Sequence, residues 1–88
     1  MLLSEAIDLY IRHIKNIDRS RETIKGYTIE LNLLGRFLYK KYNGPVYIEE
    51  ISLHDLEDYM QSLKEKGYAA ASRNRVVYIV RSFYNFCY

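Results

Sequence analysis

Residues 20–45 read SRETIKGYTIELNLLGRFLYKKYNGP, and this stretch decides the fold. Ser20 predicts a helix N-cap, because its hydroxyl can accept a hydrogen bond from a free backbone N–H of the first turn. Residues 43–45 predict the end of the helix, because glycine favours a left-handed C-cap and proline cannot continue the backbone ladder. We therefore expect a helix over about residues 21–42. Its apolar side chains recur at helical spacing and predict one buried stripe: Ile24, Tyr27, Leu31, Leu34 and Leu38.

The stretch upstream predicts a shorter helix over about residues 5–17, with Ser4 as its N-cap. Residues 18–20 (DRS) break it before Ser20 starts the next helix. Apolar residues at helical spacing again mark one face, made of Ile7, Tyr10, Ile11, Ile14 and Ile17.

Two further helices are predicted downstream. Residues 46–48 (VYI) favour an extended loop, because a solitary β-prone stretch has no partner strand. Ser52 and Asp55 predict a capping box at the start of a third helix, and Gly67 predicts its end. The side chains expected to face the core are Leu53, Leu56, Met60 and Leu63.

The fourth helix is expected from about residue 70 to the end of the sequence. Residues 68–71 (YAAA) hold no Ser or Thr, so its first turn should be poorly capped. Its core stripe is Val76, Val80, Phe83 and Cys87, and Tyr10, Tyr27 and Tyr59 are also expected in the core. The sequence therefore predicts one all-α domain over residues 1–88.

Composition excludes several classes of protein. One cysteine among 88 residues excludes a disulfide framework and a CxxC metal clip. His13 and His54 stand far apart without acidic or cysteine partners at ligand spacing, so no metal site is expected. The first residues do not form a signal peptide, and no apolar run has membrane-spanning length. We expect a soluble cytoplasmic, nucleoid-associated bacterial protein that binds no cofactor.

Charge is sorted along the chain. Residues 68–88 contain three arginines and no acid, whereas residues 44–67 contain six acids and two lysines. Helical phase places a row without carboxylates opposite the core stripe of the second helix, with Glu22 near one end, and another such row on the fourth helix. Such bases, amides and hydroxyls donate to phosphate oxygens and base edges. The residues on or beside these rows include Arg21, Lys25, Asn32, Arg36, Asn74, Arg75, Tyr78 and Arg81.

Three segments resemble the N-terminal core-binding (SAM-like) domain of tyrosine recombinases, the family of phage integrases and Xer-type recombinases. Residues 20–27 (SRETIKGY) are similar to its S-x-x-T-x-x-x-Y helix entry. Residues 50–56 (EISLHDL) with Tyr59 resemble its third conserved helix. Residues 72–75 (SRNR) and 80–86 (VRSFYNF) resemble its last helix. The resemblance implies a compact orthogonal bundle of four or five helices.

The resemblance also implies duplex DNA as the partner, bound by the second and fourth helices as half of a clamp. It implies other recombinase protomers in a tetrameric synapse. By matching motif it assigns DNA contacts to Thr23, Lys25, Ser72, Asn74 and Arg75. Helical phase adds Arg21, Arg36, Tyr78 and Arg81, and Arg73 within the SRNR motif completes the set.

No catalytic residues are expected in this chain. A nucleophilic tyrosine such as Tyr88 needs an Arg/His cradle to activate it and to stabilise the transition state, and no such pattern is present. The resemblance places that chemistry on a C-terminal domain, expected downstream of residue 88.

Two other readings remain open at this stage. One is a helical protein-interaction module whose acidic third helix, with Asp55, Glu57 and Asp58, meets a basic face of a neighbour. The other is a helix-turn-helix regulator, which fits less well because the connections do not obviously form its tight turn.

Overall fold

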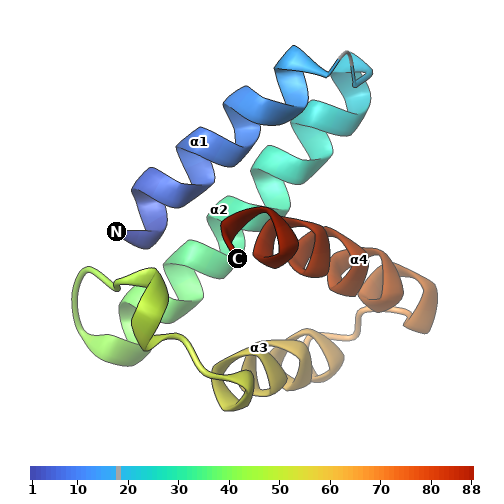
Figure 1. The fold of residues 1–88 in the computed structure, drawn as a ribbon. Coiled ribbons are helices and arrows are strands. Elements are labelled where there is room, and N and C mark those ends of the chain that lie inside the picture. Colours follow the sequence, from blue (N-terminus) through green and yellow to red (C-terminus); the bar gives the residue numbers. More distant parts are fainter. Residues whose placement is uncertain (18) are drawn as a thin grey trace.

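The computed structural model describes residues 1–17 and 19–88, and the described chain is all-α, as predicted. Figure 1 shows the order of the elements, in which a single turn of 3₁₀ helix (η1) lies between the second and third α-helices. Among these residues the one β-type contact is an isolated bridge between Leu2 and Tyr47. The elements are α1 (Leu3–Asn16), α2 (Arg21–Tyr42), η1 (Ile48–Glu50), α3 (Leu53–Glu65) and α4 (Ala70–Cys87).

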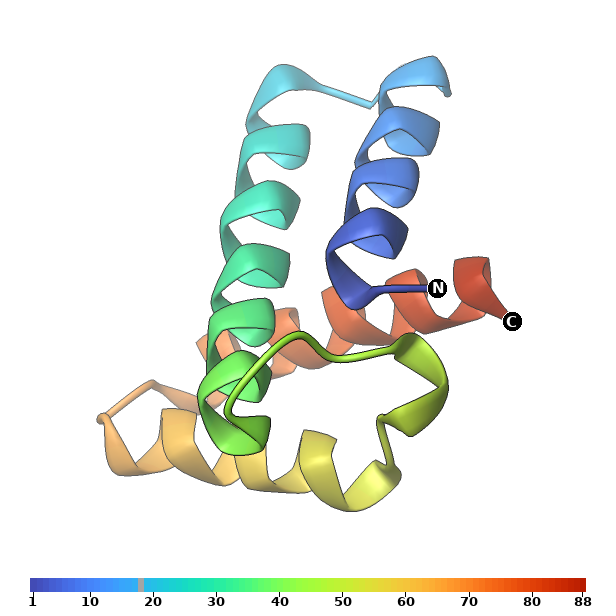
Figure 2. The same cartoon turned by 90° about the vertical axis from the view of Figure 1, so that its left-hand side faces the viewer.

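The helices form two crossed layers. α1 and α2 lie side by side and antiparallel, and α4 runs across both of them (Figures 1 and 2). α3 lies along the other side of α4 and against the C-terminal half of α2. The expected orthogonal bundle is therefore present, and the steep crossing brings the first half of α4 over α2.

The core forms where the two layers meet. Phe83 of α4 is fully buried, and its ring packs edge-on against Tyr10 of α1 at 5.6 Å between centroids. Tyr10, Tyr27 and Tyr59 are all buried, as the sequence predicted. On α2 the predicted stripe is confirmed at Tyr27, Leu31, Leu34 and Leu38, whereas Ile24 is partly buried at its edge.

The bounds of α2 agree with the sequence prediction. Ser20 Oγ accepts a hydrogen bond from the Thr23 N–H at 3.1 Å, which confirms the N-cap. At the other end Asn43, not Gly44, takes the left-handed C-cap conformation, with φ 58°. Asparagine tolerates the left-handed region better than most residues, so Asn43 can form the C-cap before Gly44 is reached.

The start of α1 differs from the prediction. The helix begins at Leu3, and Leu2 instead of Ser4 occupies the N-cap position. Long-range bonds decide this, because Leu3 N donates to Val46 O at 2.8 Å and Ile48 N donates to Met1 O at 2.9 Å. At the other end the helix closes at Asn16, one residue short of the predicted bound, and Asp18 of the predicted break lies outside the described residues.

The capping box of α3 is confirmed, but the predicted inward face is wrong at Leu53, which is 74% exposed. The buried residues are Asp55, Tyr59 and Leu63, one turn apart from each other. Lys41 and Tyr42 at the end of α2 bind the Asp55 carboxylate, each at 2.6 Å. This polar contact turns α3 so that its first leucine points to solvent.

α4 follows the prediction closely. Val76, Val80 and Phe83 are buried, and Cys87 is half-buried at the end of the stripe. Its N-cap residue, Ala69, has no side-chain hydrogen bond to the first turn, as expected. Residues 66–69 join α3 to α4, at the place that Gly67 and the predicted helix start at residue 70 indicated.

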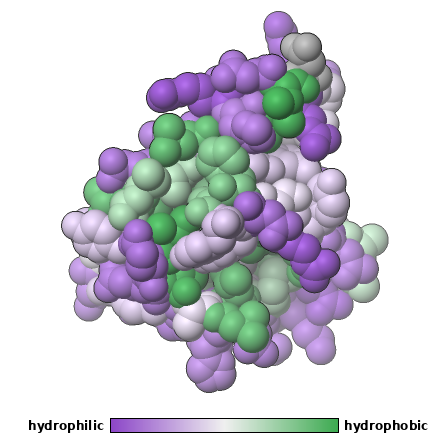
Figure 3. Space-filling view, viewed as in Figure 1, coloured by the Kyte–Doolittle hydropathy of each residue, from purple (hydrophilic) through white to green (hydrophobic). Residues whose placement is uncertain are grey.

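Hydrophobic side chains also reach the surface. Figure 3 shows a hydrophobic area near the middle of one face, surrounded by hydrophilic side chains. Leu9 of α1 and Phe86 of α4 are among the partly exposed apolar residues, at 39% and 40%. None of the described helices is both long enough and apolar enough to cross a membrane.

Candidate nucleic-acid interface

Arg75 of α4 lies directly on the backbone of α2 where the two helices cross. A Cβ atom at Gly26 would stand 2.3 Å from Arg75 Nη2, so the guanidinium occupies the space that a side chain would fill. Arg75 Nη1 also pairs with Glu30 Oε1 at 3.7 Å, and the arginine side chain remains 54% exposed. One side of the guanidinium therefore rests on α2 while the rest is open to solvent.

Two tyrosines and a second arginine lie beside this contact. Burial raises the pKa of Tyr27, the Tyr78 hydroxyl raises it further, and the charges of Arg19 and Arg75 act in the opposite direction. The same pattern holds for Tyr10: burial and the neighbouring Tyr27 raise its pKa, and the charge of Arg19 lowers it. Tyr10 and Tyr27 stack with centroids 6.3 Å apart, and the charge of Arg19 acts on both rings while that of Arg75 acts on Tyr27.

We call this surface the crossing face. It carries the Arg75 guanidinium, which is paired with the Glu30 carboxylate, and the acid Glu22 lies one turn before Gly26 on the same side of α2. Its residues are Arg19, Thr23, Gly26, Arg75, Tyr78 and Ser82, of which Thr23 is placed by its position one turn before Gly26.

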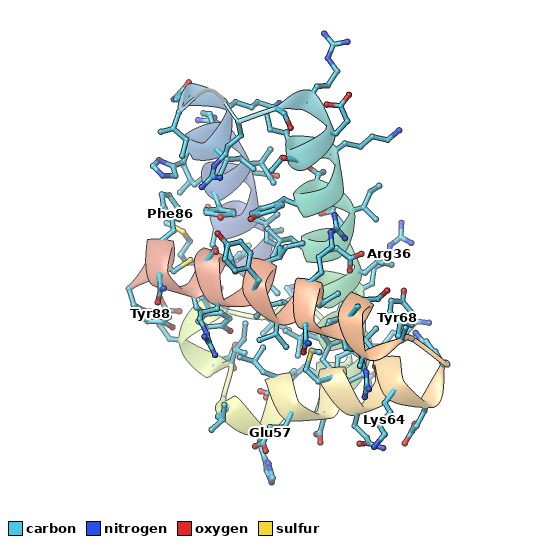
Figure 4. All side chains as sticks on the ribbon, turned by 90° about the vertical axis from the view of Figure 1, so that its right-hand side faces the viewer. Arg36, Glu57, Lys64, Tyr68, Phe86 and Tyr88 are labelled. Carbon is cyan, nitrogen blue, oxygen red and sulfur yellow. The ribbon has the colours of Figure 1, made fainter. Side chains whose placement is uncertain are left out.

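The predicted α2 residues divide between two surfaces. Thr23 is half-buried near the crossing, and its hydroxyl accepts a hydrogen bond from Ser20 Oγ at 2.8 Å. Lys25 is exposed, and as the residue before Gly26 it points about 100° away from Gly26 around the helix. Arg21 is exposed at the first turn. Arg36 instead lines a hollow beside the start of α1, together with Asp8, and Figure 4 shows it at the edge of α2.

The predicted α4 residues also divide. Ser72 lies one turn before Arg75 on the same side of the helix, and Tyr78 is 58% exposed. Asn74 and Arg81 are exposed on the outer ridge of α4, which also forms one edge of the space between α3 and α4. Arg73 points the other way, into the space between α3 and α4, where its Nε is buried without a hydrogen-bond partner among the described residues. The structure therefore brings Arg75 and Tyr78 to α2 near Gly26 and Tyr27, and it places Arg36 and Arg73 on other surfaces.

A broad open groove of about 930 Å³ runs between α3 and α4. Its walls are largely apolar, with Leu56, Met60 and Val77 among them. One rim carries Glu57 and the other carries Arg81. This groove lies on the opposite side of α4 from Gly26 and Arg75.

Two of the four acids of α3, Asp55 and Asp58, bind side chains of α2. Lys41 Nζ binds Asp55 Oδ1 and Asp58 Oδ2, both at 2.6 Å, and these hydrogen bonds raise the pKa of Lys41. Burial works to raise the pKa of Asp55, but hydrogen bonds from Lys41, Ser52 and Tyr42 hold it well below its usual range. Within residues 1–17 and 19–88, no group of three His, Cys, Asp or Glu side chains could hold a metal ion.

The sequence analysis missed three members of the crossing face as candidates. Arg19 was assigned only to the break between helices, Gly26 carries no chemistry of its own, and Ser82 was only a flanking residue. An arginine next to a helix N-cap and a glycine inside a strongly helical segment were the available signals. Neither reveals which helix passes over it.

The crossing face can hold a polyanion. Its two guanidinium groups and the exposed Tyr78 ring offer charge-assisted hydrogen bonds to phosphate and apolar contact to sugar or base. The acid-free surface of α4 extends this positive region along Asn74 and Arg81. The local potential therefore favours an extended anion over a small neutral ligand.

Comparison with known families agrees with this fold. The model of the family described as phage integrase, N-terminal SAM-like domain, matches residues 7–88. No curated protein and no solved structure matches the chain. Because the match covers all of α2, α3 and α4 and most of α1, the chain belongs to the phage integrase N-terminal SAM-like domain family.

Proposed function

We propose that this domain binds duplex DNA through the crossing face and the outer ridge of α4, as the N-terminal half of a DNA clamp in a tyrosine recombinase. One observation carries the proposal: Arg75, from the segment without acids, lies against α2 at Gly26, within a domain of the integrase family. The crossing joins the two helices that the sequence analysis assigned to DNA.

The kind of DNA contact proposed for each residue follows from its position on the surface. Arg19, Lys25 and Arg75 bind phosphates, because charged groups on an exposed surface fix position on the duplex without reading sequence. Asn74, Tyr78 and Arg81 project from α4 and reach toward base edges, which provides sequence preference. Arg21 and Ser72 add contacts at the first turns of their helices. Arg36 and Arg73 contribute little to the same surface, because they face other sides of the molecule.

Binding by this domain alone is expected to be weak and sensitive to salt. About four to six phosphate contacts give a slope of log K against log[salt] of about −4 to −5. The catalytic groups, including a nucleophilic tyrosine, belong to a further domain of the recombinase, and protomers assemble on the recombination site. The domain described here supplies DNA docking rather than chemistry.

The test is fluorescence anisotropy with a labelled duplex at several salt concentrations. Arg75→Ala and Lys25→Ala should each weaken binding several-fold and make the salt slope shallower by about 0.9, the loss of one phosphate contact. Lys64→Ala is the matched control, because Lys64 is an exposed lysine on α3 at the far side of the molecule (Figure 4). Equal loss in all three variants, or no loss in any, contradicts the proposed face.

One observation favours a second candidate, a helical protein-interaction module. The groove between α3 and α4 is apolar, and Leu53 stands at its end 74% exposed. Of the acids first considered, Asp55 is buried and Asp58 is paired with Lys41, which leaves Glu57 on the rim. Concentration-dependent NMR shifts at Leu53 and Glu57 without DNA would support this candidate instead.

One feature fits a helix-turn-helix regulator: residues 66–69 form a turn of the length found in such proteins. Membership of the integrase family favours the clamp nonetheless. A palindromic site recovered by sequence selection would favour the regulator.

A further inference from the structure

Gly26 and Glu30 of α2 form a seat for Arg75, and we use that name for these two residues. They stand one helical turn apart, on the side of α2 that α4 crosses. The guanidinium lies over Gly26 and reaches Glu30 Oε1 at 3.7 Å. No side chain at position 26 separates it from the backbone of α2.

The glycine has no other use that the structure reveals. Within 4 Å of a Cβ built at position 26, the heavy atoms belong to Arg75, with Nη2 at 2.3 Å and Cζ at 3.6 Å. Glycine inside a helix destabilises it by about 1 kcal/mol relative to alanine, because the unfolded chain gains freedom. The domain therefore gives up helix stability at this position, and what it gains in return is room for one guanidinium.

Glu30 is held in an unusual state for a carboxylate. Its side chain is 13% exposed, and its Oε2 is buried with no hydrogen-bond partner among the described residues. Burial raises the pKa of the nearby Tyr59 to about 12, and the charge of Glu30 contributes to that rise. Its pairing with Arg75 is the one salt bridge that the structure gives to Glu30, so the two charges depend on each other.

We propose that Gly26 and Glu30 are positioning residues that hold the Arg75 guanidinium ready for a DNA phosphate, and this inference rests on the proposed DNA-binding function. A free arginine side chain loses about 2 kcal/mol of rotamer entropy when it is fixed. An arginine that already rests in the seat has lost part of that freedom before DNA arrives. Its exposed half then presents N–H donors to one phosphate in a fixed direction.

The matched pair Gly26→Ala and Gly35→Ala tests this on one helix. Both changes raise helix propensity equally. At position 35 the added Cβ makes an ordinary contact with Ile7 Cδ1 at 3.7 Å, whereas at position 26 it displaces the end of a flexible arginine. Both variants should stay folded in urea titrations. Gly26→Ala should lower the affinity for a duplex DNA roughly fivefold, which is part of the loss expected when a charged hydrogen bond is removed altogether. Gly35→Ala should stay within about twofold of wild type.

A cycle with Arg75→Ala separates this inference from the proposed function. In the Arg75→Ala background, Gly26→Ala should cause no further loss. If wild type binds DNA and Arg75→Ala weakens it, but Gly26→Ala behaves like Gly35→Ala, the seat is refuted and the DNA-binding proposal stands. Tighter binding by Gly26→Ala also refutes it, because the seat would then hold Arg75 away from DNA. If wild type does not bind duplex DNA, both proposals fail.

A readout without DNA tests the seat directly. The Arg75 Nε–Hε resonance should shift in Gly26→Ala and in Glu30→Gln, and should keep its wild-type position in Gly35→Ala. An unchanged resonance in Gly26→Ala and Glu30→Gln contradicts the proposal, because the guanidinium would then not depend on either residue.

Discussion

Asp55→Asn is expected to destabilise the domain strongly, because one buried carboxylate joins the end of α2 to the start of α3. Asp55 is 2% exposed and accepts hydrogen bonds from Lys41 Nζ and the Tyr42 hydroxyl, both at 2.6 Å, and from the Ser52 N–H at 3.0 Å. Asparagine keeps the size of the side chain but turns an N–H₂ group toward one of these donors.

The magnitude follows from those contacts. A hydrogen bond to a charged group contributes about 1.5–3 kcal/mol, and a buried donor left unpaired costs a similar amount. With the loss of one such bond and the weakening of the others, Asp55→Asn should reduce the free energy of unfolding by about 2–3 kcal/mol. In urea, with m of about 1 kcal/mol/M for a small domain, the midpoint should fall by about 2–3 M.

Asp58→Asn is the matched control in the same urea titration. Its carboxylate binds the same lysine at 2.6 Å, but its side chain is 54% exposed. An exposed ion pair is worth little, so the change should be at most about 0.5 kcal/mol. Similar small effects of both substitutions would refute the assignment of Asp55 as the buried link between α2 and α3.

Three further results are expected. The stability difference between wild type and Asp55→Asn should shrink as pH falls below about 4, the ordinary pKa of an unfolded aspartate. The reason is that the pKa of Asp55 is depressed in the folded state, so its stabilisation is lost when the carboxylate is protonated. Thermal melts from pH 7 to pH 2 measure this, and a constant difference contradicts it. Leu63→Ala should cost about 2–5 kcal/mol and Leu53→Ala less than about 0.5, since the two leucines are 2% and 74% exposed; equal effects in urea titrations would mean that α3 is rotated from the orientation described. Ala69→Ser should stabilise the domain by about 0.5–1 kcal/mol by capping α4, whereas Ala71→Ser inside the helix should not; a rise in midpoint for both would exclude capping as the cause.

Local chemistry was sufficient to predict most of the helices. Ser20 and the capping box of Ser52 with Asp55 mark their helix starts with contacts inside four residues of sequence. Such signals need no knowledge of the rest of the fold. For the same reason the bounds of α2 agree with the prediction.

The errors arise where distant segments decide local structure. Leu2 replaced Ser4 as the N-cap of α1 because residues 1–3 hydrogen-bond to residues 46–48. Leu53 points to solvent because Lys41 and Tyr42, more than ten positions earlier, bind Asp55. Hydrophobic periodicity alone could not predict that the aspartate is buried and the leucine exposed.

The candidate interface was predicted only in part. Helical phase placed Tyr78 and Arg81 correctly on the outside of α4, since burial follows the periodicity of a single helix. It could not show that α4 crosses α2 at Gly26, nor that the side of α4 carrying Arg73 faces α3. Those facts depend on the crossing of two helices, which no pattern within either segment encodes.

An NMR titration of the isotopically labelled domain with a duplex DNA is the most direct test of the central claim. The account predicts amide shifts concentrated at Arg19, Gly26, Arg75 and Tyr78 that weaken as salt increases. Shifts confined to the groove between α3 and α4, around Leu53 and Glu57, would contradict it.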